Sequence, residues 1–246
     1  MAWYTRQFCG SILDNELQGD GEEWVRFHRR GRYLFFIFLI AAALLLVGGA
    51  ETITLSPQAE ELAKSIKFDR QVLIMAKEES GASIHRLIGY DEKDYQIIAD
   101  GIAVTVPADR TDMVLASLRK KLSPLKYMAF VVEVNAGIKT DRIGILKGTD
   151  QYDILRVMHT DGDDYDISNS DVIERLKEWE KSSPFDILGA DNDWVEIEFK
   201  TLPKDLRAFA EEVYDFCPDT VDQGPGSVGG LIAEIQRTKR LFLWWE

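Results

Sequence analysis

The chain has 246 residues, a formal net charge of −13 at pH 7 and two cysteines. An acidic chain without a long basic run lacks the surface that phosphate contacts require, so we expect no nucleic-acid partner. Cys9 and Cys217 lie on opposite sides of a long apolar tract, which excludes a disulfide within the part that follows the tract. The 196 residues after position 50 are enough to bury a hydrophobic core without one.

The apolar tract at residues 33–50, YLFFIFLIAAALLLVGGA, carries no charge. At about 1.5 Å per residue a helix of this length spans roughly 27 Å, close to the hydrocarbon thickness of a bilayer. Acidic residues follow the tract, and four arginines precede it: Arg26, Arg29, Arg30 and Arg32. The positive-inside rule therefore places the N-terminus in the cytoplasm and the rest of the chain outside it.

Two interpretations of this tract stay open. Residues 33–50 are either a transmembrane helix after a cytoplasmic leader at 1–32, or the apolar region of a cleaved signal peptide. Gly48 and Ala50 suit a cleavage site that leaves Glu51 as the first residue, and a start codon at Val25 would leave the first 24 residues untranslated. Both interpretations predict an extracytoplasmic domain, periplasmic or at the cell surface, which is either anchored in the inner or plasma membrane or released.

The negative charge belongs to the part after the tract. Of the 29 Lys and Arg, five precede residue 51, and of the 42 Asp and Glu, five do so as well. The remaining 24 basic and 37 acidic residues carry the whole net charge of −13. A solvated acidic surface or a basic protein partner follows from this excess.

Residues 51–148 show helical and strand patterns. Ser56-Pro57 is typical of a helix N-cap followed by proline in the first turn, and predicts a helix at 57–67. A second helix is predicted from Asp109 to residue 122, stopped by Pro124. Residues 95–106 predict a strand or a hairpin that turns near Asp100. Further strands are predicted at 72–75, 84–90, 127–134 and 142–146.

Residues 149–246 continue the alternation. Helices are predicted at 152–158 and 171–181, from Pro203 to residue 216, and around residues 231–235. A hairpin is predicted from 185–188 to 194–199, and a last strand at 241–245, buried on both faces with Trp244 and Trp245 in the core. These elements predict an α+β or α/β fold, a mixed sheet flanked by helices and preceded by one N-terminal hydrophobic helix. The sequence leaves open whether 51–148 and 149–246 are separate domains.

Several short motifs occur in the last hundred residues. They are Gln151-Tyr152-Asp153-Ile154-Leu155-Arg156, Thr160-Asp161-Gly162, Cys217-Pro218-Asp219, Val221-Asp222-Gln223-Gly224 and Leu243-Trp244-Trp245-Glu246. Their combination resembles the bacterial family called domain of unknown function 4253. This resemblance implies a C-terminal domain at 149–246 and a bacterial origin, and it carries no activity that could be transferred.

The segment at 217–230, CPDTVDQGPGSVGG, is the candidate functional loop because it combines a thiol, carboxylates, an amide and glycines before a helix. Its candidate residues are Cys217, Asp219, Asp222, Gln223 and Gly224. The spacing matches neither a phosphate-binding loop nor a dinucleotide motif. An architectural role is favoured, in which Pro218 ends the preceding helix, the two aspartates accept hydrogen bonds from loop amides and Ser227 caps the next helix.

Other chemistry-bearing residues form no recognisable site. His85 and His159 are the histidines after the tract, and neither lies in a cysteine-hydrolase signature. The densest carboxylate group is Asp161, Asp163, Asp164 and Asp166, whose spacing does not fit an EF-hand. It is interpreted as a solvated acidic turn, with a calcium site as the alternative. We therefore predict no catalytic residue, no metal and no cofactor.

The functional hypothesis is a non-enzymatic, envelope-located α+β module that binds another protein, with toxin neutralisation as one version. The sequence does not identify the protein partner. The membrane is a second partner, contacted through residues 33–50, if the tract is not cleaved. The alternative is a hydrolase that uses the 217–230 loop, with Cys217, Asp219 or Asp222 in its site.

Overall fold

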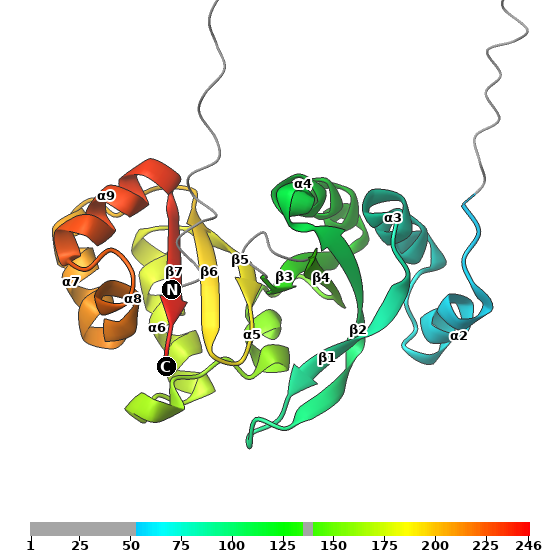
Figure 1. Ribbon diagram of the computed structural model, residues 1–246, viewed down its shortest axis with the longest axis horizontal. Helices are drawn as coiled ribbons and strands as arrows, with labels where there is room; N and C mark the ends of the chain where they lie inside the picture. Colours follow the sequence, from blue (N-terminus) through cyan, green and yellow to red (C-terminus); the bar gives the residue numbers. More distant parts are fainter. Residues whose placement is uncertain (1–52, 135–139) are drawn as a thin grey trace, which may run out of the picture. The chain divides into compact units, whose positions relative to one another are not determined.

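The computed structural model describes residues 53–134 and 140–246, and those from 54 onward belong to one compact unit (Figure 1). The predicted apolar helix at 33–50, its leader, and the connection that begins at residue 135 lie outside the described residues. Among the described residues, none of the helices has both the length and the apolar character that a membrane span needs.

Seven strands of the described chain form one mixed sheet in the order β1-β2-β4-β3-β5-β6-β7. All neighbours run antiparallel except β3 and β5, which are parallel with Val131 opposite Gly189. The strands are β1 (Ile84–Tyr90), β2 (Gln96–Pro107), β3 (Tyr127–Glu133), β4 (Thr140–Lys147), β5 (Phe185–Ala190), β6 (Trp194–Phe199) and β7 (Arg240–Trp244). The mixed α+β sheet that the sequence predicts is confirmed.

The helices cover the two faces of the sheet in chain order. One face packs on α2 (Pro57–Ser65), α3 (Arg70–Ser80) and α4 (Thr111–Leu122). The other packs on α5 (Tyr152–Met158), α6 (Asn169–Ser182), α7 (Leu206–Phe216), α8 (Pro218–Asp222) and α9 (Val228–Thr238). Strand alternation separates the two cores, because Ile102 and Val104 of β2 face the first helices whereas Ala103 between them faces the second set.

Local capping signals decide where several helices begin. The Ser56 side chain accepts a hydrogen bond from the Ala59 amide at 3.2 Å, and Pro57 is the first helical residue of α2, as predicted. Ser168 and Asp171 form a reciprocal capping box, so α6 begins two residues earlier than predicted. Ser227 caps α9 through the Gly230 amide, as predicted.

The strand predicted at 72–75 is wrong, because these residues lie inside α3. Asp69 caps that helix by accepting from the Gln71 amide, and Gly81 ends it with a left-handed backbone angle of +69°. The buried residues of α3 are Val72, Leu73, Ala76 and Ser80. Their spacing is that of one helix face, which a four-residue apolar run could not distinguish from a strand.

Three further boundaries differ from the prediction. The 95–106 run is one strand, and the chain turns before it, where the Asp91 carboxylate accepts hydrogen bonds from the Lys93 and Tyr95 amides. The helix predicted to open at Pro203 begins at Leu206 instead, because Asp205 is its N-cap. The 217–230 segment is not a continuous loop, since it contains α8, and Pro218 both follows the end of α7 and begins α8.

Strand β7 is an edge strand, and the predicted burial of both its faces is only partly right. Leu241 and Leu243 are buried in one core, while Phe242 and Trp244 are only partly buried against the other. Trp245, just beyond the strand, is 4% exposed. The two adjacent tryptophans therefore differ, with Trp245 in the core and Trp244 partly accessible.

Candidate functional site

Cys217, the predicted thiol of the candidate loop, is buried and hydrogen-bonded. Its Sγ lies 3.0 Å from Thr220 Oγ1 and donates to the Trp244 carbonyl oxygen, also at 3.0 Å. Burial raises the pKa of the thiol to about 11, although the hydrogen bonds act in the opposite direction. A thiol that is protonated and enclosed at neutral pH is a poor nucleophile, so these contacts favour a structural role.

Asp219 holds the end of the chain. Its Oδ2 accepts a hydrogen bond from the Glu246 amide at 3.0 Å, and its Oδ1 accepts one from Gln223 Nε2 at 3.1 Å. Burial raises the pKa of Asp219, but these bonds and one from the Tyr165 hydroxyl outweigh it and lower the pKa below its ordinary value. Asp219 therefore accepts a hydrogen bond from a backbone amide, but that amide belongs to Glu246 and not to the loop, where the sequence predicts it.

Thr220, which the sequence did not single out, covers the outer edge of β7. Its hydroxyl accepts from the Trp244 amide and donates to the Phe242 carbonyl, each at 3.2 Å. Together with Cys217 it satisfies backbone groups that an edge strand would otherwise present to solvent or to another strand. The CPDT run and the terminal LWWE run therefore form one hydrogen-bond network, although more than twenty residues separate them in the sequence.

The remaining candidate residues lie on the outside of this network. Asp222 is exposed, and its carboxylate accepts a hydrogen bond from the Tyr214 hydroxyl at 3.4 Å instead of from loop amides. Gln223 is also exposed, although its side-chain amide donates a hydrogen bond to Asp219. Gly224 is needed for close packing, because an added Cβ would lie 2.5 Å from the Thr220 carbonyl oxygen. The structure thus joins Asp219 and Gln223 directly and leaves Asp222 apart.

The β1–β2 hairpin carries an exposed apolar surface. Tyr95 is 68% exposed, Ile97 42% and Ile98 71%, and we call these three residues the hairpin surface. Figure 1 shows the end of this hairpin running out beyond the helices that cover the sheet. Ile97 lies opposite Gly89, so no side chain across the hairpin covers it. The sequence predicted a strand or a hairpin over 95–106, and it did not indicate that the first part of this run is exposed.

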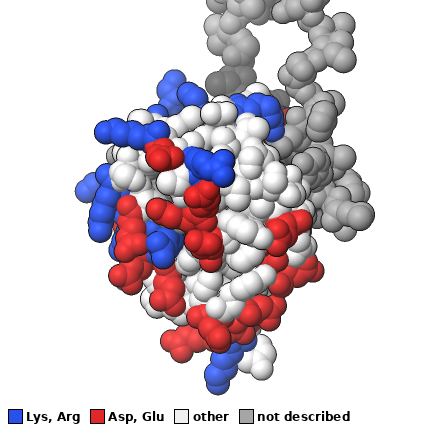
Figure 2. Space-filling model, turned by 90° about the vertical axis from the view of Figure 1, so that its left-hand side faces the viewer, with Lys and Arg blue, Asp and Glu red and all other residues white. Residues whose placement is uncertain are grey.

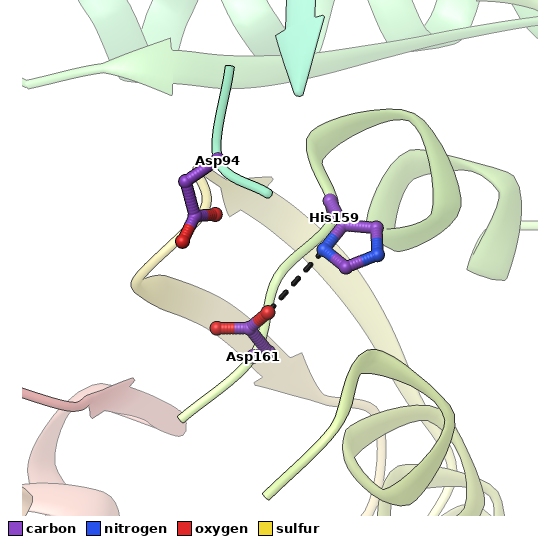
Figure 3. A group of neighbouring side chains, drawn as sticks. All are labelled: Asp94, His159 and Asp161. Atoms are coloured by element: carbon purple, nitrogen blue, oxygen red, sulfur yellow. Dashed lines mark ion pairs between the residues drawn. The ribbon is translucent and has the colours of Figure 1, made fainter. Parts of the chain in front are cut away.

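A second cluster joins two segments that are distant in sequence. Asp94 lies in the turn between β1 and β2, while His159 ends α5 and Asp161 follows it (Figure 3). One ligand atom from each residue lies within 4.8 Å of the other two. His159 Nδ1 is 3.3 Å from Asp161 Oδ2, without the geometry of a hydrogen bond. In Figure 3 the Asp94 side chain and the His159 ring both lie above the Asp161 carboxylate.

The charge of this cluster is poorly compensated. Burial raises the pKa of Asp161, and the nearby Asp94 carboxylate raises it further, whereas His159 lowers it. The neighbouring turn between β5 and β6 adds Asp191, whose pKa burial raises to about 6. Of the three residues of this cluster, His159 and Asp161 are two positions apart, and this spacing could have indicated a shared site from the sequence. Asp94 is brought to them only by the fold.

The rest of the predicted acidic turn is solvated. Asp163, Asp164 and Asp166 are exposed in and after a short 3-10 helix at Asp163–Tyr165. Gly162, at the start of this turn, lies against Trp245, and an added Cβ would be 2.7 Å from the indole Cδ1. The acidic group that looked continuous in sequence is therefore divided, with Asp161 facing His159 and the other three facing solvent.

Comparison with known proteins finds a similarity in the C-terminal part of the chain. Residues 142–246 match one family model. It is described as a domain of unknown function, DUF4253. The resemblance of the C-terminal part to this family is confirmed, and the DUF4253 match begins in β4 and contains the whole CPDT–LWWE network. No curated protein and no solved structure matches the chain.

Proposed function

We propose that the α+β unit is a protein-binding module that contacts its partner through the hairpin surface. The observation that carries the proposal is the grouping of exposed apolar side chains. Six large hydrophobic residues of the described chain are exposed, and three of them lie within four consecutive positions, 95 to 98. Single exposed hydrophobics are ordinary, whereas here one projecting strand segment is apolar on both faces, with Ile97 on one and Ile98 on the other. A partner that encloses this segment would gain free energy because burial releases ordered water.

The two edges of the sheet support this choice of surface. The outer edge of β7 is covered by Thr220 and Cys217. Strand β1 is the opposite edge and pairs with β2 alone in the described sheet. Proteins cover edges that must not pair with other chains, so the β1 edge, which adjoins the hairpin surface on β2, is the edge left for a partner.

Charge indicates what kind of partner fits. Glu92 and Asp94 are exposed in the hairpin turn beside Tyr95, with Lys93 between them. Figure 2 shows acidic side chains gathered over the lower part of the face that carries the left-hand helices of Figure 1. A partner with an apolar patch bordered by Lys or Arg would be complementary in charge and would associate faster at low salt. A basic toxin that is neutralised by being covered is one version of such a partner.

The hydrolase alternative stays a prediction without a supporting contact. Cys217 is enclosed and protonated, and Asp219 is engaged by the chain end. Neither contact supplies the base or the open reacting position that an acyl-transfer site needs.

The proposed location is the extracytoplasmic side of a membrane, supported by the apolar tract at 33–50 and the arginines before it. A reporter that is active only outside the cytoplasm, fused after Glu246, should be active. An inactive reporter would contradict the location. Mass analysis of the mature protein then distinguishes a transmembrane helix from a signal peptide, because a chain that begins at Glu51 has lost the tract by cleavage.

The binding proposal is tested by comparing three proteins in affinity capture from the envelope fraction of the host. They are the wild type, the double variant Ile97→Ser and Ile98→Ser, and the control Met113→Ser, whose side chain is 60% exposed on α4. We expect the wild type and the control to retain the same partner and the double variant to lose it. Surface changes of this kind alter the free energy of unfolding by only about 0.5 kcal/mol. Equal capture by all three folded proteins would contradict the proposal.

A further inference from the structure

We propose that Asp94, His159 and Asp161 bind one divalent transition-metal cation, for which Zn²⁺ is the best probe. The site goes beyond the binding function proposed above and does not depend on it. It rests on ligand geometry, on a buried nitrogen without a hydrogen-bond partner, and on the chemistry of the three donors.

The distance between the imidazole and the carboxylate fits a shared cation. Two ligands at about 2.1 Å from a tetrahedral zinc lie about 3.4 Å apart. His159 Nδ1 and Asp161 Oδ2 are 3.3 Å apart. The third ligand atom, from Asp94, lies within 4.8 Å of both. Because Asp94 is exposed on a turn, a rotation of its side chain can bring its oxygen into the same coordination sphere.

The second observation concerns His159 Nδ1 itself. This nitrogen is buried and has no hydrogen-bond partner among the described residues, and Figure 3 shows it directed at the Asp161 carboxylate. Buried polar atoms in folded proteins are nearly always satisfied, so one that is not indicates a missing partner. A cation bound to the Nδ1 lone pair would supply that partner. It would also compensate the Asp161 carboxylate, which burial and Asp94 hold in an unfavourable environment.

The donor set selects the class of cation. Calcium requires six to eight oxygens, whereas an imidazole with two carboxylates suits zinc and its neighbours in the first transition series. Three protein ligands leave a fourth tetrahedral position for water. The ligands come from the β1–β2 turn and from the segment after α5, so the cation would connect these two segments.

The test is isothermal titration of the full-length chain with Zn²⁺ after treatment with a chelator. The site variants are Asp94→Asn, Asp161→Asn and His159→Asn. Asparagine is chosen at position 159 because the backbone there is left-handed, with φ of +52°, which asparagine tolerates well. The control is Asp164→Asn, an exposed carboxylate of the neighbouring solvated turn.

We expect one Zn²⁺ per chain, a loss of affinity of at least tenfold in His159→Asn and Asp161→Asn, and a change of less than twofold in the control. Hydrogen exchange of the amides at 91–95 should slow when Zn²⁺ is added to the wild type and stay unchanged in His159→Asn. Asp94→Asn changes an exposed side chain, so its weakened binding cannot be attributed to misfolding. Absence of binding, or binding with equal affinity by all four variants, would overturn the proposal.

Discussion

The Asp219 carboxylate accepts a hydrogen bond from the backbone amide of Glu246, 27 positions further along the chain, at 3.0 Å. This contact ties the N-terminal turn of α8 to the residue that follows β7 and Trp245. It gives the CPD motif a structural purpose, because Cys217 and Thr220 bond backbone groups of Trp244 and Phe242, two and four residues before Glu246. The conspicuous motifs of the DUF4253 part thus describe how the C-terminus is held.

Asp219→Ala should lower the free energy of unfolding by about 1–3 kcal/mol, because it leaves the partly buried Glu246 amide and the Gln223 side chain without a charged acceptor. Asp222→Ala is the matched control and should cost less than about 0.5 kcal/mol, since that carboxylate is exposed. Urea denaturation at pH 7 measures both. Equal costs would mean that the network contributes nothing beyond the loop itself.

The same carboxylate predicts a dependence on acid. The pKa of Asp219 is lowered in the folded chain, so its ionised form stabilises the fold above the ordinary aspartate pKa. This contribution should disappear as the pH falls through the lowered value. The stability difference between wild type and Asp219→Asn should therefore shrink between pH 6 and about pH 3. A difference that stays constant over this range would contradict the assignment.

Cys217 should be unreactive in the folded protein. With its pKa raised to about 11, its thiolate fraction at pH 8 is more than about 100-fold below that of an exposed cysteine, and burial slows access further. Alkylation by iodoacetamide, followed by mass spectrometry in a Cys9→Ala background, should show modification only after denaturant is added. Rapid modification of the native protein would show an accessible thiol and would favour the hydrolase alternative.

Trp245→Ala should destabilise the protein by about 3–5 kcal/mol, as a truncation of a buried aromatic side chain. Its ring lies edge-on to Phe216 at 5.8 Å between centroids. Phe209→Ala should cost a similar amount, because Phe209 contacts the rings of Trp179 and Phe199 at 5.1 and 5.6 Å. Trp244→Ala should cost clearly less, since Trp244 is only partly buried. Thermal and urea unfolding of the three variants would show whether this order holds.

Asp191 should make the protein less stable as the pH rises. Burial raises its pKa to about 6, so the folded chain retains a proton between about pH 4 and 6 that the unfolded chain has lost. The protonated Asp191 carboxyl therefore contributes its full stabilisation below about pH 4, and this contribution is lost as the pH rises through about 6. Asp191→Asn should stabilise the protein at pH 7.5, by at most about 3 kcal/mol, and have little effect at pH 4.

The measurement is urea unfolding at both pH values in the presence of a chelator. Asp109→Asn, at an exposed position, is the control and should show no such difference between the two pH values. Destabilisation by Asp191→Asn at pH 7.5 would show that the ionised carboxylate has a favourable partner, and it would contradict the predicted gain in stability.

The elements that sequence reasoning predicted well are those whose signals act within a few residues. Ser56 and Pro57 begin α2, the 185–199 hairpin pairs antiparallel, and the apolar stripe of α7 includes Phe209 and Val213 as buried residues. Caps, turns and periodicity decide these features locally, so they can be read without the fold. The α+β class and the mixed sheet followed from their alternation.

Features that depend on distant residues were decided only by tertiary structure. A short apolar run at 72–75 became part of α3 because helix caps and packing on the sheet outweighed its strand propensity. The exposure of Ile98 depends on where the covering helices end, and the difference between Trp244 and Trp245 depends on the position of β7 at the sheet edge.

The candidate sites show the same limit. The sequence by itself determined that Asp219 follows the end of a helix at Pro218 and that His159 and Asp161 are neighbours. It could not place Glu246 on Asp219 or Asp94 beside His159, because such contacts are set by strand order and by the packing of α5 and α8 on the sheet. The physical reason is that local hydrogen bonding acts over about four residues, whereas burial joins residues regardless of their separation in the chain.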